Sequence, residues 1–229
     1  MAEQKKEIII TINGSQLIGQ EGMTILEVTR EHGIDIPTLC YHEDLTPVGA
    51  CRLCVVEVEN ARTLVASCHT PISPGMVVYT HSPKVIETRK VIVELMLASH
   101  PDVCIVCDKT NICELRRIAT DLEIGLPRFK LRKHCYPIED SSPYIIRDMS
   151  KCIKCWRCVR GCAEIARRNI YGIAYRGFDS KVVVDLDEPL NKEVCRDCDV
   201  CVSLCPSGSL GKVRKLGEAK QGKPLVITK

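Results

Sequence analysis

The stretch KCIKCWRCVRGC, residues 151–162, places four cysteines at gaps of two, two and three residues. The same spacing returns in residues 195–205, where Pro206 follows the last cysteine. Three closely spaced thiols can surround one metal cluster, while the next turn of the chain carries the fourth sulfur away from it. The spacing therefore predicts two clusters that share their ligands across the repeats.

This repeat matches the bacterial C-x2-C-x2-C-x3-C-P run, whose fourth cysteine ligates the other cluster of a two-cluster ferredoxin. We expect one [4Fe–4S] cluster on Cys152, Cys155, Cys158 and Cys205, and a second on Cys195, Cys198, Cys201 and Cys162. The segment between the runs, residues 170–187, reads as strand, Gly-Phe-Asp turn and strand, which predicts a β-hairpin.

Composition places the chain among globular proteins, since 45% of its 229 residues are hydrophobic. It holds 16 cysteines but only 4% aromatic residues, so we expect sulfur to fill part of the interior. Residues 1–10 lack a signal-peptide pattern, and the longest apolar run, from Val91, is interrupted by Glu94. We therefore expect a soluble, cytoplasmic protein whose reduced thiols serve as metal ligands.

The first third of the chain predicts a small β-grasp sheet. Residues 7–20 alternate β-branched and polar residues around Asn13-Gly14, a strong hairpin signal, and Thr24 caps a short helix that ends before Gly33. Four cysteines accompany this sheet: Cys40, Cys51, Cys54 and Cys68. Their spacing departs from the plant-type ferredoxin pattern only in its first and last gaps, which predicts a [2Fe–2S] cluster.

Ser82 and Pro83 begin a predicted helix that reaches residue 99. A second metal-ligand group follows it at gaps of three, two and five: His100, Cys104, Cys107 and Cys113. Because imidazole replaces thiolate at some iron–sulfur sites, His100 is the natural fourth ligand of a [4Fe–4S] cluster. Cys135 is a rival fourth ligand and His134 a weaker one. The ordinary alternative is that His100 interacts with the last carbonyls of the helix.

Zinc is the main competing metal, but the pairs 152/155 and 195/198 are too far apart for the usual zinc ribbon. Four oxidised clusters would add about −7 to the formal charge of +3. Basic residues around the first repeat then predict charge compensation or a docking face, with a solvated helix face as the alternative: Lys151, Lys154, Arg157, Arg160, Arg167 and Arg168. The basic C-terminal tail lacks stacking aromatics, which disfavours nucleic-acid binding.

The order of these three cysteine groups resembles the N-terminal electron-transfer module of the large iron–sulfur subunit of respiratory complex I, the iron-only hydrogenases and the NAD-linked formate dehydrogenases. The resemblance covers about residues 7–210, and CIKCWRCVR, residues 152–160, looks like the first repeat of that family. The length is most similar to the small diaphorase subunit of NAD-reducing or electron-bifurcating hydrogenases and formate dehydrogenases. We accordingly expect no H-cluster or molybdopterin domain.

The resemblance implies a subunit that relays electrons between an FMN-bearing, NADH-oxidising subunit and a hydrogenase or formate dehydrogenase subunit, with ferredoxin as a further candidate partner. The alternative is the iron–sulfur subunit of an NADH dehydrogenase-like complex. We expect one [2Fe–2S] and three [4Fe–4S] clusters, and no substrate-converting, flavin or nicotinamide site. Cys135 has no cluster, so it is either a buried small hydrophobe or a reactive thiol of a hidden active site.

These predictions combine into an α+β chain of three domains and a tail. Residues 1–81 are expected to form the β-grasp domain, 82–139 the helical segment with the His/Cys3 site, and 140–210 the two-cluster domain. Residues 211–229 are expected to form the C-terminal tail. A catalytic role would then come only through a larger oxidoreductase complex, in which this chain is one subunit.

Overall fold

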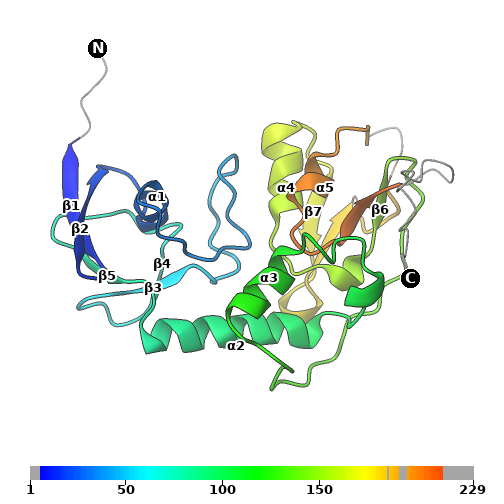
Figure 1. Cartoon of the computed structure of the whole chain (residues 1–229). Helices are drawn as coiled ribbons and strands as arrows, with labels where there is room; N and C mark the ends of the chain where they lie inside the picture. The colour runs from blue at the N-terminus through cyan, green and yellow to red at the C-terminus, as the bar shows by residue number, and fades with distance from the viewer. Residues whose placement is uncertain (1–5, 185, 191–194, 214–229) are drawn as a thin grey trace, which may run out of the picture.

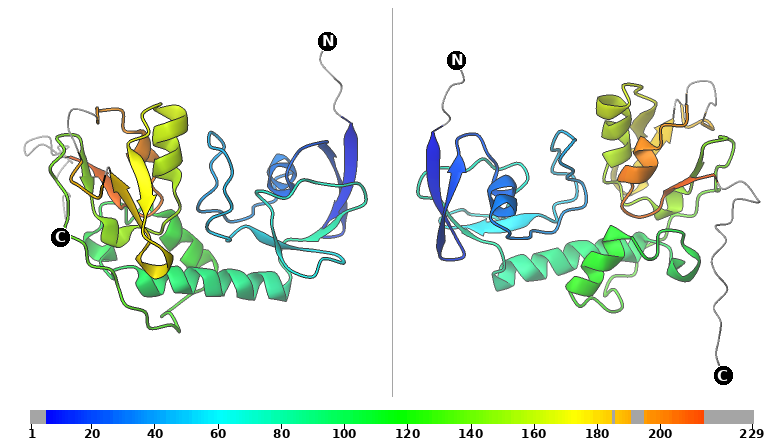
Figure 2. Two further views of the ribbon diagram at one scale, coloured as in Figure 1. Left: turned by 180° about the vertical axis from the view of Figure 1, so that it is seen from behind. Right: turned by 45° about the horizontal axis from the view of Figure 1, so that its top comes forward.

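The computed structural model describes residues 6–184, 186–190 and 195–213. A five-stranded sheet lies at one end of the molecule and two two-stranded sheets at the other, with the long helix α2 (Pro83–Ser99) running beneath both (Figure 1). Two further views show the same separation (Figure 2). The predicted α+β class is confirmed, with a 2Fe-2S ferredoxin-like part and a 4Fe-4S ferredoxin-like part.

The five-stranded sheet has the order β2-β1-β5-β3-β4, with β5 parallel to β1 and the other pairs antiparallel. Its strands are β1 (Glu7–Ile12), β2 (Ser15–Gln20), β3 (Val55–Val58), β4 (Val65–Ala66) and β5 (Val77–Tyr79). The predicted hairpin turns at Asn13 and Gly14, both with positive φ. Thr24 caps α1 (Ile25–Glu31) in a capping box with Glu27, and the buried face of α1 packs on the sheet.

Helix α2 begins where the sequence predicts. The hydroxyl of Ser82 accepts from the Val85 amide at 3.3 Å, Pro83 is the first helical residue, and His100 follows the last turn. Helix α3 (Glu114–Asp121) packs against α2 through Leu115 and Ile118. A shared apolar cluster thus joins α2 and α3 to the loop before β3.

The C-terminal part is built on two antiparallel strand pairs and two short helices that pack together. The pairs are β6 (Ile145–Arg147) with β9 (Leu210–Lys212), and β7 (Tyr171–Ala174) with β8 (Lys181–Val184). The helices are α4 (Arg157–Arg160), which widens into a π turn over Gly161–Ile165, and α5 (Val200–Leu204). Single 3-10 turns cover Cys104–Val106, Met149–Lys151 and Gly177–Asp179. The β7–β8 pair is the hairpin predicted between the repeats.

The two ends of the molecule have different interiors. Isoleucine, leucine and valine dominate the core of the five-stranded sheet, whereas five of the twelve buried residues of the C-terminal core are cysteines. The expectation that sulfur fills part of the interior is confirmed there. Within the described ranges, no helix has both the length and the apolar character to cross a bilayer. Most of the predicted tail lies outside the described residues, and its first two positions belong to β9.

Candidate metal centres

The cysteines of the β-grasp part are all buried and lie in loops beside the sheet. Cys40 lies within the long loop between α1 and β3, Cys51 and Cys54 flank a turn at the end of that loop where Arg52 has a φ of 58°, and Cys68 follows β4. The hydroxyl of Ser67 donates to the carbonyl of Cys54 at 2.8 Å and ties the last two loops together.

Donor groups point at these sulfurs. The four thiols interact as two pairs. The Cys51 side chain lowers the pKa of Cys40, while the Cys40 side chain raises that of Cys51. In the same way Cys68 lowers the pKa of Cys54, and Cys54 raises that of Cys68. Iron–sulfur clusters are held by thiolates, and clustered donors stabilise that charged form. One sulfur of each pair, Cys40 or Cys54, is thus favoured as a thiolate, and a [2Fe–2S] cluster bound by all four would displace the remaining thiol protons.

The middle group lies where α2 ends and α3 begins. Cys104 is exposed, while Cys107 and Cys113 are half-buried and close enough to each other to interact electrostatically. Cys107 also packs against the C-terminal part: a Cβ at Gly208 would lie 3.4 Å from its sulfur and 2.8 Å from Cγ of Lys109. Gly208 also has a φ of 76°. Both the lack of room for a Cβ and the left-handed backbone conformation therefore favour glycine at this position.

His100 has the hydrogen bonding of a metal ligand. Its Nδ1 lies 3.0 Å from the carbonyl of Pro101, which can only accept, so Nδ1 carries the proton. Its Nε2 is buried with no hydrogen-bond partner among the described residues, and burial lowers the pKa of the ring. A metal-binding histidine typically donates its other ring nitrogen to a carbonyl in this manner. The neutral imidazole thus presents an unused lone pair.

The rival ligands have other surroundings. The ring of His134 stacks between Tyr136 and Phe178, and its Nε2 lies 2.9 Å from the Phe178 carbonyl while Nδ1 lies 3.2 Å from the Tyr136 hydroxyl. Both ring nitrogens are therefore occupied. Cys135 is exposed, so the expectation that it is a buried small hydrophobe is wrong. The geometry favours His100, and the identity of the fourth ligand stays a prediction.

Replacing His100 by alanine is expected to disturb the middle centre alone, because the other predicted ligand sets keep all their sulfurs. Bound iron should fall by at most ~4 of ~14 atoms, the content of one [4Fe–4S] cluster. Anaerobic iron and sulfide quantification with low-temperature EPR measures this loss. The control is Cys135→Ala, which should retain the wild-type iron content. Full iron in His100→Ala together with a loss in Cys135→Ala would make Cys135 the ligand.

In the two-cluster part, the structure groups the cysteines across the repeats. One small cavity is lined by Cys152, Cys155, Cys158 and Cys205, and a second by Cys162, Cys195, Cys198 and Cys201. Each cavity takes three sulfurs from one repeat and the fourth from the other. No three His, Cys, Asp or Glu side chains among the described residues are arranged to hold a single metal ion.

Local geometry explains this exchange. The residue after the second cysteine of each repeat, Trp156 or Asp199, has a positive φ and begins a short helix that carries the third cysteine. The fourth cysteine follows directly after the helix, with Cys162 in the π turn after α4 and Cys205 as the C-cap of α5. At Gly161, directly after α4, a Cβ would lie 2.2 Å from Cδ1 of Leu204 in α5. The two helices therefore pack so closely that only glycine fits at this position. This close packing brings each fourth sulfur to the other cavity.

Residues of all four ligand groups share two buried clusters. One apolar cluster contains Cys40 and Cys51 of the first group and Cys155 of the two-cluster part, and Cys113 of the middle group packs against it. Cys158 and Cys201, which line different cavities, both belong to the core of the C-terminal part. The predicted centres therefore form one continuous series through the protein interior.

Burial dominates the acidity of the thiols in the two-cluster part. It raises the pKa of Cys152 to about 11, that of Cys155 to about 12, and that of Cys201 to about 11. Cluster ligation requires thiolates, so loading these cavities releases protons. The metal then supplies the positive charge that these buried sulfurs otherwise lack.

Two of the basic residues noted in the sequence are buried. Arg157 and Arg160 of α4 are only 5% and 7% exposed, so the solvated-face interpretation is wrong for them. Lys151 forms an ion pair with Asp148 at 2.9 Å, and Lys154 donates to the Phe178 carbonyl. Sequence reasoning did not identify what Arg157 and Arg160 contact.

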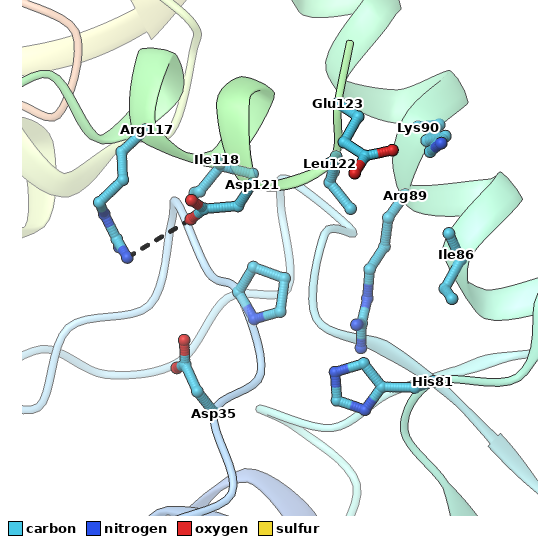
Figure 3. A pocket seen from close by; sticks show the side chains of 11 residues that line it. Asp35, His81, Ile86, Arg89, Lys90, Arg117, Ile118, Asp121, Leu122 and Glu123 are labelled. Carbon is cyan, nitrogen blue, oxygen red and sulfur yellow. Dashed lines mark ion pairs between the residues drawn. The ribbon is translucent and has the colours of Figure 1, made fainter.

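A separate cavity lies between the β-grasp part and the helices α2 and α3 (Figure 3). Asp35 and His81 line one side and Arg117, Asp121 and Arg89 the other, with an ion pair of 3.8 Å between Arg117 and Asp121. No cysteine lines this cavity. Its wall nevertheless reaches the first cysteine group, because Nη2 of Arg89 donates to the carbonyl of Val55, the residue after Cys54, at 2.8 Å.

Three family models match successive parts of the chain. Residues 5–83 match a 2Fe-2S iron-sulfur cluster binding domain, residues 89–128 the NADH-ubiquinone oxidoreductase-G iron-sulfur binding region, and residues 142–211 the ferredoxin-like domain of NADH-quinone oxidoreductase subunit 3. These regions contain the four cysteine groups described above. Binding domains for both 2Fe-2S and 4Fe-4S clusters are therefore present.

Curated relatives carry the same regions within longer chains. The NADP-reducing hydrogenase subunit HndD of Solidesulfovibrio fructosivorans is 39% identical over 208 residues, which cover 89% of this chain and 36% of that protein. An NADH-quinone oxidoreductase subunit of Rhizobium meliloti is 38% identical over 205 residues, with coverages of 89% and 24%. The chain thus spans about a quarter to a third of the length of these relatives.

A solved structure matches most of the chain as well. A chain of the NAD+-reducing [NiFe]-hydrogenase in the H2-reduced state superposes with a TM-score of 0.81 at 28% identity. The match covers 90% of this chain and 87% of that one. The match thus covers most of both chains, whereas the match to each curated relative covers only a minor part of that relative.

Proposed function

We propose that this chain, which matches the iron–sulfur regions of NADH-quinone oxidoreductase subunits and of NAD(P)-linked hydrogenase subunits, is an electron-transfer subunit with four clusters. One is a [2Fe–2S] cluster and three are [4Fe–4S] clusters. Bound clusters supply the one-electron chemistry of such a subunit. The residues of the chain hold the clusters, exclude water and set their potentials.

The proposed ligand sets follow the geometry of the four cysteine groups. The [2Fe–2S] cluster takes Cys40, Cys51, Cys54 and Cys68, and the middle [4Fe–4S] cluster takes His100, Cys104, Cys107 and Cys113. The remaining clusters take the cysteines of the two cavities, with Cys205 and Cys162 exchanged between the repeats. The unpartnered Nε2 of His100 and the donors around Cys40 and Cys54 support these sets.

The observation that carries the proposal is the continuity of the centres. Cysteines of three centres lie in or against one apolar cluster, and Cys158 and Cys201, which belong to the last two centres, lie in one buried core. A structural metal protein has no need to bring its metals together, whereas an electron relay requires it. The C-terminal core is accordingly organised around cysteine instead of aromatic rings.

We further propose that the subunit works between an FMN-containing, NADH-oxidising subunit and a hydrogenase or formate dehydrogenase subunit, with ferredoxin as a partner in an electron-bifurcating complex. The similarity to the NADP-reducing hydrogenase subunit and to the NAD+-reducing hydrogenase chain supports this placement. The second candidate, an NADH dehydrogenase-like complex, is supported by the similarity to the NADH-quinone oxidoreductase subunit of Rhizobium meliloti. Copurification of the endogenous complex and identification of its subunits distinguishes the two.

The test of the proposed function is anaerobic iron and sulfide quantification with EPR of the dithionite-reduced protein. The expected content is ~14 iron atoms per chain, distributed over one [2Fe–2S] and three [4Fe–4S] signals. A colourless, redox-silent protein that binds zinc would contradict the proposal. Turnover of an electron donor by the isolated subunit, abolished in Cys135→Ser, would instead indicate an active site of its own.

A further inference from the structure

Helix α4 carries Cys158 between two arginines, and the two arginines have different partners. Both side chains are almost completely buried, which is rare for charged residues unless they are paired. Arg157 forms a two-pronged ion pair with Glu114, with Nη1 to Oε1 at 2.6 Å and Nη2 to Oε2 at 3.0 Å. Its positive charge is therefore balanced by a carboxylate.

Arg160 reaches the loop of the first metal centre instead. Its Nη1 donates to the carbonyl of Thr46 at 2.6 Å and its Nη2 to the carbonyl of Cys40 at 2.5 Å. The carboxylate of Glu164, on the following turn, accepts from the Thr46 amide at 2.8 Å. The segment after Cys158 thus clamps both ends of the loop that presents Cys40.

The charge of Arg160 has no carboxylate partner within the part of the chain that the structure describes, since the acceptors recorded for its Nη atoms are neutral carbonyls. An unpaired buried charge is costly. The charge instead lies beside a residue of the first ligand group, because the carbonyl that accepts from Nη2 is that of Cys40 itself. Thiolates of a bound [2Fe–2S] cluster are the natural counter-charge.

We infer that Arg160 is a positioning residue of the [2Fe–2S] centre, which holds the Cys40 loop against the two-cluster part and favours the reduced cluster through its unpaired charge. This inference rests on the proposed function, because it assumes that Cys40 ligates the cluster. Reduction adds one negative charge to the cluster, and a buried cation beside Cys40 stabilises that state. Arg157 has its own carboxylate and provides a matched comparison on the same helix.

The experiment compares Arg160→Gln, Arg160→Lys and the double variant Arg157→Gln/Glu114→Gln by potentiometric titration monitored by EPR. In Arg160→Gln we expect full iron content and a downward shift of the [2Fe–2S] midpoint potential. The shift should be smaller in Arg160→Lys, which keeps the charge but cannot donate through a planar fork. The double variant and the exposed control Arg167→Gln should leave the [2Fe–2S] potential at the wild-type value.

An unchanged [2Fe–2S] potential in fully loaded Arg160→Gln would overturn the inference. If that variant fails to load, Arg160→Lys decides: a loaded cluster near the wild-type potential supports the charge role, and failure to load leaves only a structural role and overturns it. Absence of a [2Fe–2S] signal in the wild-type protein would refute the proposed function itself. The two failures are therefore distinguishable.

Discussion

Replacing Cys205 with serine is expected to remove the [4Fe–4S] cluster that the first repeat builds, although the other three ligands come from residues 152–158. The side chain of Cys205 lines the cavity of those three ligands, whereas the other cysteines of its own repeat line the second cavity. The expected loss is ~4 of ~14 iron atoms. Cys162→Ser should remove the other cluster by the same exchange.

EPR and iron quantification on the two variants test directly whether Cys205 and Cys162 are exchanged between the repeats. The variants are matched controls for each other, since each removes one thiol of identical spacing from one repeat. Exchanged ligation predicts that each variant keeps the signal of the cluster built on the first three cysteines of its own repeat. Loss of that signal instead, in either variant, would show that each repeat ligates its own cluster.

Local features of the fold were predictable because short-range rules determine them. Asn13-Gly14 fits a hairpin turn since both positions take positive φ, and Ser82 caps α2 since its hydroxyl replaces a missing helical partner. The C-x2-C-x2-C-x3-C spacing also predicts that Cys162 and Cys205 exchange clusters, and the cysteines line the two cavities in that grouping, while the ligation itself stays a prediction.

Long-range contacts were not predictable from the same reasoning. The pairing of β6 with β9 joins segments that no turn signal connects. Arg157 and Arg160 lie in a run of basic residues that a solvated helix would also contain, and their partners, Glu114 and the Cys40 loop, are distant in sequence. Only packing reveals that these charges are buried. The unpartnered Nε2 of His100 likewise depends on where Pro101 turns the chain.

Removing the iron is expected to unfold the C-terminal part while the five-stranded sheet persists. The core of the sheet consists mainly of aliphatic side chains such as Ile10 and Ile12, which stay packed without metal. In the C-terminal core, cysteines make up five of the twelve buried residues, and the strands β7 and β8 pack around them. Without metal, those thiols line unfilled cavities, and the core around the short strands loses the group that completes it.

Hydrogen exchange followed by mass spectrometry, on holoprotein and on protein stripped of iron under anaerobic reducing conditions, measures this difference segment by segment. Protection in β7 and β8 should fall by at least ~1,000-fold, equivalent to ~4 kcal/mol of opening free energy, while β1 keeps most of its protection. Reloading with iron and sulfide should restore the lost protection. Equal protection of β7 in both forms would mean that the aliphatic residues of the C-terminal core suffice, and that its clusters are bound by a preformed scaffold. Metal binding and folding are coupled where the metal completes the core. The protection of β1, measured in the same sample, is therefore the internal control for the loss of protection in β7 and β8.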